Sequence, residues 1–274
     1  MKCFTIIAIA ICACAVVLVG FGNAALAYHV KFDFETTWTG DYAPGWENSD
    51  YRHGEPPVGK MMQQTTVAKN GTYGMKLIAD STPEDWMWWV GVNVTDVWSI
   101  AMEKQYDPWI SVWYYDELST EATPWAGQIN TVPSWVVDED WTDVQFGGRF
   151  NVTDNYYYVT AHKTGGPGWQ DTGVARTNDW HHLKMQLSNS DNLIHFYLDG
   201  AEVGTSTRAD YLDLGTTPGL YTMFLDPLSD YGDDKPYTYW DDFEFGSTYV
   251  PEPGTILMIL GGLAGLAGIV RRRK

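Results

Sequence analysis

Hydrophobic and polar residues alternate along the middle of the chain with a period of two, which predicts β-strands. In the segment 29–35, Val30, Phe32 and Phe34 fall on one face. The segment 181–187 places its leucines and methionine on one face in the same way, and 193–198 follows with a similar pattern. Other segments alternate or are rich in β-branched and aromatic residues, which favour strands: 73–77, 89–94, 109–115, 219–225 and 237–245. No convincing helical period occurs between residues 28 and 249, so we expect an all-β domain there.

Turn signals and length indicate one β-sandwich in this region. Asp199 and Gly200 follow the strand 193–198 directly and form a typical hairpin turn. The stretch 116–145 contains Pro124 and Pro133 among many polar residues, and we expect a long loop there. The chain has no linker or internal repeat that would divide residues 28–249, which fit one large sandwich.

The first 27 residues have the pattern of a secretory signal peptide. A basic start at Lys2 precedes an apolar run over 4–22, and the small residues at 25–27 offer a cleavage site for signal peptidase before Tyr28. An uncleaved membrane anchor is the alternative. The three cysteines, Cys3, Cys12 and Cys14, lie inside this segment, so the mature chain is expected to have no disulfide and no cysteine nucleophile.

The last 25 residues have the pattern of a second membrane segment. Residues 254–270 carry no charge over 17 positions, which is at the short limit for a spanning helix. Four consecutive cations follow and would stop transfer on the cytoplasmic side: Arg271, Arg272, Arg273 and Lys274. We therefore expect 28–249 to be exported across the inner membrane and held by a C-terminal transmembrane helix.

A short motif precedes this helix: Val250, Pro251, Glu252 and Pro253. Together with the Gly-rich apolar helix and the basic end, it resembles the PEP-CTERM sorting signal of exopolysaccharide-producing Gram-negative bacteria. The resemblance implies that an exosortase-type enzyme recognises the tail and cleaves near the motif. It also implies a final place at the cell surface or in the extracellular matrix. A permanent single-pass anchor is the alternative.

Charge narrows the choice of partners. The chain has 17 basic against 35 acidic residues, and its formal net charge is -18. Five of the basic residues lie in the two terminal segments, so 28–249 holds 12 basic and 34 acidic residues. Nucleic-acid binding needs a basic face, and we therefore expect no nucleic-acid partner.

The domain 28–249 resembles concanavalin A-like and laminin-G-like domains. The matching segments are 179–183 (Asp-Trp-His-His-Leu), 194–200 (Ile-His-Phe-Tyr-Leu-Asp-Gly) and 240–245 (Trp-Asp-Asp-Phe-Glu-Phe). The resemblance implies an antiparallel jelly-roll β-sandwich, flanked here by the signal helix and the C-terminal transmembrane helix. Lectins, glycan-binding modules, glycoside hydrolases and lyases share this fold, so the fold alone leaves the function open.

Acidic residues near both ends of the domain are candidate metal ligands. If Phe32, Phe34, Phe243 and Phe245 face the core, nearby carboxylates share the outer face and repel one another. Ca²⁺ is the hard, oxygen-binding cation that would relieve this repulsion, and the family sometimes holds Ca²⁺ here. The candidate ligands are Asp33, Glu35, Asp241 and Asp242. A solvated acidic face without an ion is the alternative.

Aromatic residues are the second set of candidates. The chain has 14 tryptophans, and flat rings exposed on a surface can stack on the apolar faces of sugars. Aromatic residues within strands are expected in the core, whereas those expected in or beside loops are the candidate glycan contacts: Trp125, Trp135, Trp141, Tyr157 and Trp169.

Catalytic patterns are weak. Retaining glycosidases of the resembled fold carry paired carboxylates on one strand in the pattern Glu-x-Asp-x-(x)-Glu, which does not occur here, and neither does a Gly-x-Ser-x-Gly motif. We therefore name no catalytic residue. The sequence favours an exported surface or matrix protein that binds extracellular polysaccharide without cleaving it. A polysaccharide-degrading enzyme on the same fold, or a purely structural or adhesive surface protein, is the alternative.

Overall fold

Every element in the described part of the computed structural model is a β-strand, as the sequence predicts. That part comprises residues 26–38, 46–48, 62–78, 90–93, 105–117, 126–132, 144–149, 152–160, 168–207, 222–228 and 237–249. His29–Ser247 forms one unit, and Met1–Tyr28 with Thr248–Lys274 forms a second. The predicted signal helix and transmembrane helix lie outside the described residues.

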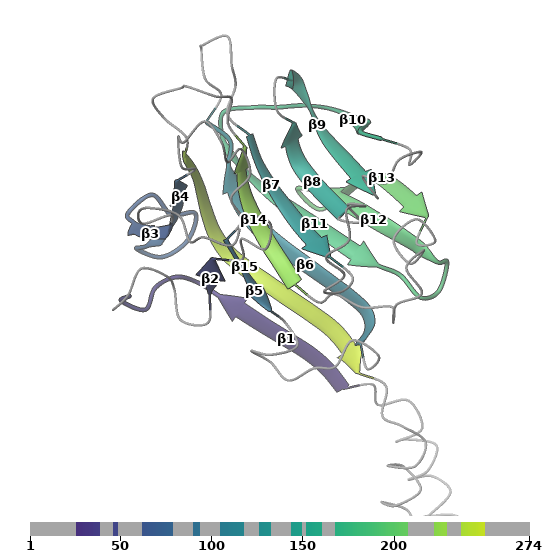
Figure 1. Cartoon of the computed structure of the whole chain (residues 1–274), viewed down its shortest axis with the longest axis horizontal. Coiled ribbons are helices and arrows are strands. Elements are labelled where there is room, and N and C mark those ends of the chain that lie inside the picture. Colours follow the sequence, from purple (N-terminus) through teal and green to yellow (C-terminus); the bar gives the residue numbers. More distant parts are fainter. Residues whose placement is uncertain are drawn as a thin grey trace, which may run out of the picture. The chain divides into compact units, whose positions relative to one another are not determined.

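The strands form two antiparallel sheets, which we name sheet A and sheet B (Figure 1). Sheet A runs in the order β13 (Ala201–Thr207), β12 (Leu193–Leu198), β11 (Trp180–Leu187), β6 (Gln105–Tyr115), β15 (Tyr237–Tyr249), β4 (Gly74–Ile78) and β3 (Met62–Thr65), and β1 (Leu26–Phe32) pairs with β15. Sheet B runs in the order β10 (Gln170–Ala175), β9 (Val152–Thr160), β8 (Val144–Arg149), β7 (Ala126–Val132), β14 (Thr222–Leu228), β5 (Val90–Asn93) and β2 (Glu47–Asn48). Strands far apart in the sequence are neighbours, as in a jelly-roll sandwich.

The core lies between the inner faces of the two sheets. The ring of Phe146 on β8 packs against Phe196 on β12 with centroids 5.5 Å apart, and Tyr158 on β9 stacks on the same ring at 4.4 Å. Phe196 belongs to sheet A, whereas its two partners belong to sheet B. Full burial of one such side chain stabilises the fold by about 1.5–3 kcal/mol.

The alternation read from β11 and β12 is confirmed. Leu183, Met185 and Leu187 are fully buried, as is Phe196 opposite Met185. The residues between them are partly exposed and form the outer face of sheet A. One face of each strand therefore lies in the core, as a period of two requires.

The hairpin predicted at Asp199 and Gly200 is also confirmed, and it joins β12 to β13. Both residues have positive φ, 51° and 82°, which matches the twist that a tight two-residue hairpin turn requires. The carboxylate of Asp199 accepts a hydrogen bond from the backbone N–H of His182 at 2.8 Å. The turn is thereby tied to the neighbouring strand β11.

Two details of the predicted strands are wrong. The expected loop over 116–145 contains β7 and the start of β8, and β7 pairs with both β14 and β8. The first strand ends at Phe32 instead of continuing to Glu35. Phe34 has a positive φ of 57°, and the side chain of Asp33 accepts a hydrogen bond from the N–H of Glu35 at 3.1 Å, so the chain turns there.

Candidate functional site

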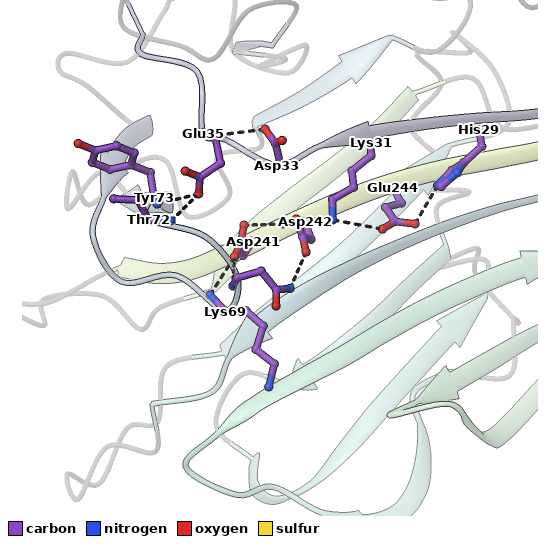
Figure 2. Close-up of polar contacts among 11 residues, drawn as sticks. His29, Lys31, Asp33, Glu35, Lys69, Thr72, Tyr73, Asp241, Asp242 and Glu244 are labelled. Carbon is purple, nitrogen blue, oxygen red and sulfur yellow. Dashed lines mark hydrogen bonds and ion pairs between the residues drawn. The ribbon is translucent and has the colours of Figure 1, made fainter.

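The carboxylates of β15 hold the loop between β3 and β4 (Figure 2). Asp241 accepts hydrogen bonds from the backbone N–H groups of Lys69 and Asn70, each at 2.8 Å. Asp242 accepts one from the side chain of Asn70 at 2.6 Å and forms an ion pair with Lys31 at 2.7 Å. Burial raises the pKa of Asp241, although the hydrogen bonds from Asn70, Asp242 and Lys69 act in the opposite direction.

Glu35 binds the other end of the same loop (Figure 2). Its Oε1 accepts the backbone N–H groups of Thr72 and Tyr73, each at 2.8 Å. Gly71, directly before them, has a φ of 70°, and a Cβ atom there would overlap Glu35 Oε1. Both the positive φ and the close approach of the carboxylate favour glycine at this position.

The four candidate metal ligands thus already accept protein donors. Asp241 and Asp242 are buried, and Asp242 is covered by Lys31 and Asn70. Within the described ranges, no group of three or more His, Cys, Asp or Glu residues is placed to hold a metal ion. Calcium at Asp33, Glu35, Asp241 and Asp242 stays a prediction of the sequence.

Two of the five candidate glycan contacts, Tyr157 and Trp169, fall in the described part; Trp125, Trp135 and Trp141 lie outside it. Tyr157 is partly exposed on β9, opposite Asp171 of the edge strand β10. The carboxylate of Asp171 accepts hydrogen bonds from the N–H of Gly173 at 2.7 Å and from Asn155 at 2.9 Å. The hydrogen bonds from Gly173, Asn155 and Tyr157, in that order, lower the pKa of Asp171 and keep it ionised. Trp169 is likewise partly exposed, directly before β10.

A larger aromatic surface covers the outer side of sheet A. On β6, Ile110, Val112 and Tyr114 face the core, so the odd-numbered residues between them face outward. The rings of neighbouring strands meet these outward residues. We name the set the aromatic face; all its members are partly exposed: Trp109, Trp113, Tyr115, Trp180, His182, Tyr197, Tyr237 and Tyr239.

Ring contacts run across three strands of the aromatic face. Trp180 on β11 lies 5.4 Å from Tyr115 on β6, measured between ring centroids. Tyr115 in turn lies 6.3 Å from Tyr239 on β15, which lies 5.3 Å from Tyr237. Each such aromatic pair contributes about 0.5–1.5 kcal/mol beyond simple burial. The rings therefore form one supported row instead of separate side chains.

A separate ring pair lies on β6 and β11. Trp113 on β6 lies opposite His182 on β11, with ring centroids 4.9 Å apart. Further along β6, the indole of Trp109 lies against Gly246 of β15, where a Cβ atom would overlap the ring. Burial lowers the pKa of His182, so this ring is neutral at pH 7 and acts as a flat, partly apolar surface.

Sequence reasoning missed this face because it assigned aromatic residues within strands to the core. The segment 109–115 carries large apolar side chains at both odd and even positions. Only one of the two sets can face the core of a two-sheet sandwich, and the other set must lie on the outer surface. A strand with large apolar side chains on both faces was therefore the sequence signal that could have predicted an exposed aromatic surface.

The tail and the β-sandwich each show a separate similarity to known proteins. Residues 250–274 match the PEP-CTERM protein-sorting motif. This motif implies export and recognition by an exosortase-type processing enzyme. No curated protein matches the chain.

The described strands resemble those of glucanases. The catalytic domain of an endo-1,3-β-glucanase (laminarinase) from Thermotoga petrophila RKU-1 is 12% identical, with 82% of this chain and 99% of that chain covered and a TM-score of 0.52. A β-glucanase of Bacillus licheniformis is 14% identical, with 79% and 97% covered and a TM-score of 0.49. The first likeness identifies the fold as a concanavalin A-like jelly roll.

In the part of the chain with described structure, no helix is long and apolar enough to cross a membrane.

Proposed function

We propose that this chain is an exported surface or exopolysaccharide-matrix protein that binds carbohydrate without cleaving it, and that the aromatic face of sheet A is a binding surface. The supporting observation is one row of contacting rings, together with the separate Trp113–His182 ring pair, on the outer side of β6, β11 and β15. The outer face of an antiparallel sheet is ordinarily polar where it meets water. Here tryptophan and tyrosine occupy it instead.

The chemistry of such a surface suits sugar rings. A pyranose has apolar C–H faces, which stack on flat aromatic rings, and hydroxyl groups, which hydrogen-bond to phenol and indole groups. A row of rings held by one another stays in position without a ligand, so little conformational entropy is lost on binding. A linear polysaccharide that extends along the row would contact several rings at once.

The residues at β9 and β10 form a second candidate platform under the same proposal. Tyr157 and Trp169 are partly exposed there, beside the ionised Asp171. The two platforms belong to different sheets, so single substitutions separate them: Trp113→Ala on sheet A and Tyr157→Ala on sheet B.

The test is a polysaccharide pull-down and glycan-array screen with the whole chain in detergent, followed by assay of the same samples for released sugar. Retention of a polysaccharide by wild type and its loss in Trp113→Ala supports the proposal. Loss only in Tyr157→Ala moves the site to sheet B. Release of sugar supports the enzyme alternative, and neither binding nor release supports a purely structural role. Exposed Tyr73, which contacts none of the aromatic face in the described structure, provides the control Tyr73→Ala.

A further inference from the structure

Three lysines lie over rings of the aromatic face. The ammonium group of Lys69 lies 4.4 Å from the ring centroid of Trp113, and that of Lys76 lies 4.3 Å from Tyr237. Lys184 lies between two rings, 4.9 Å from Trp109 and 5.5 Å from Tyr197. Cations prefer such positions over ring faces.

These lysines differ from the other cations whose side chains the structure describes. Lys31 forms an ion pair with Asp242, and Arg176 binds Asp116 in the core. Among the described residues, no carboxylate forms an ion pair with Lys69, Lys76 or Lys184. In a protein with a net charge of -18, three ammonium groups on one surface that pair with no described carboxylate are unexpected.

The acidic groups near this surface are engaged elsewhere. Glu244 binds His29 at 2.8 Å, and Glu202 binds His195 at 3.2 Å. Glu117 forms a hydrogen bond with Tyr237. Among the described residues, none of these carboxylates forms an ion pair with the three lysines.

Lys184 shows most clearly that an anion would be favourable here. It lies on β11 opposite Ser111 of β6, whose small side chain leaves the ammonium group between the rings of Trp109 and Tyr197. Its side chain is partly buried, and burial lowers its pKa. An anion bound beside it would replace lost water contacts and favour the charged form.

We infer that the polysaccharide bound at the aromatic face is an anionic one, whose sugar rings stack on the tryptophans and tyrosines while its carboxylate or sulfate groups pair with Lys69, Lys76 and Lys184. This inference rests on the proposed function. Alternating rings and ammonium groups match an acidic polysaccharide, which presents apolar C–H faces and regularly spaced charges. A nucleic acid fits less well, because three cations on a strongly acidic protein do not make the basic face that a phosphate backbone needs.

The experiment compares matched polymers. The whole chain in detergent is titrated with polygalacturonate, with the same polymer after chemical reduction of its carboxyl groups, with a sulfated galactan, and with single-stranded DNA. We expect at least tenfold tighter binding of an anionic polysaccharide than of the reduced polymer. The polygalacturonate and sulfated-galactan titrations separate carboxylate from sulfate recognition. We also expect the anionic affinity to fall with increasing salt.

Charge variants locate the contact. Lys184→Gln should weaken binding of the anionic polymer about threefold to tenfold and flatten its salt dependence. Lys31→Gln is the matched control: Lys31 is already paired with Asp242, and this variant should bind within about twofold of wild type. Thermal unfolding of each variant verifies that it is folded.

The outcomes separate the two proposals. Equal binding of polygalacturonate and its reduced form, with both lost in Trp113→Ala, overturns the anionic assignment and leaves the carbohydrate-binding function standing. No binding of any polysaccharide overturns both. Tighter binding of DNA than of either anionic polysaccharide, or an unchanged affinity in Lys184→Gln, also overturns the inference.

Discussion

Asp116 and Arg176 form an ion pair in the core of the sandwich, where neither side chain has any exposed surface. Arg176 Nε donates to Asp116 Oδ2 at 2.8 Å. The hydroxyl groups of Tyr114 on β6 and Tyr156 on β9 donate to the same carboxylate at 3.1 and 2.9 Å. Because β6 belongs to sheet A and β9 to sheet B, one carboxylate links both sheets.

Replacing only one residue of this ion pair should strongly destabilise the protein. Burial opposes the charge of Arg176, but the hydrogen bonds and charge of Asp116 keep its pKa raised. We expect Arg176→Met to lower the free energy of unfolding by about 3–5 kcal/mol, because the buried carboxyl group of Asp116 loses its cationic partner. The double variant Asp116→Leu with Arg176→Met should recover much of that loss. Urea denaturation measures both, and equal stability of Arg176→Met and wild type would refute the interpretation.

The loop between β3 and β4 depends on the approach of Glu35 to Gly71. Gly71→Ala should destabilise the protein by about 2–4 kcal/mol, from the cost of a positive φ together with weakened hydrogen bonds to the carboxylate. Gly173→Ala is the matched control, because its φ of 69° is nearly the same but a Cβ atom there would meet nothing within 4 Å. The control should lose only about 1–2 kcal/mol. Similar losses in the two variants would show that Glu35 does not restrict Gly71.

Calcium binding at Asp33, Glu35, Asp241 and Asp242 is tested by thermal unfolding. An ion that binds only the folded state raises the melting temperature by mass action, so a calcium site predicts a higher Tm in millimolar Ca²⁺ than with a chelator. Asp33→Asn should reduce that difference. An unchanged Tm would show that no calcium ion binds at these residues. The carboxylates of Glu35, Asp241 and Asp242 would then serve only as anchors for the loop between β3 and β4.

Processing of the tail depends on the sorting motif. Replacing Pro251, Glu252 and Pro253 together with alanine should abolish cleavage by an exosortase, because the motif match at 250–274 begins with these residues. In a host with the enzyme, immunoblotting should then detect the full-length chain in place of the processed one. Replacing Thr255 alone with alanine is the control and should leave processing intact. Normal processing of the triple variant would contradict the sorting assignment.

Local patterns predicted the strands and turns that depend on nearby residues. Leu183, Met185 and Leu187 lie in the core, and the turn at Asp199 joins two strands, as their sequence spacing indicates. β7 was missed because Ala126–Val132 has little alternation of its own, and its strand conformation depends on pairing with β14, nearly 100 residues later. Pairing of that kind is a tertiary effect that local propensity does not contain.

The candidate sites depended even more on tertiary structure. The sequence identified Asp241 and Asp242 as notable acids, but not that the loop holding Lys69 and Asn70 would cover them. The aromatic face combines residues from four strands of sheet A, and only strand order places them together. The sorting tail could be predicted without knowledge of the tertiary structure, because its three sequence elements are contiguous.

Binding of polysaccharide to the aromatic face can be measured by affinity electrophoresis of the whole chain in detergent. Wild type, Trp113→Ala, Trp180→Ala and the control Tyr73→Ala would be run through gels that contain the polysaccharide selected by the pull-down screen. We predict that wild type and Tyr73→Ala are retarded, and that each tryptophan variant loses at least fivefold in affinity while keeping its Tm within a few degrees of wild type. Equal retardation of all four proteins would show that the aromatic face does not bind the polysaccharide.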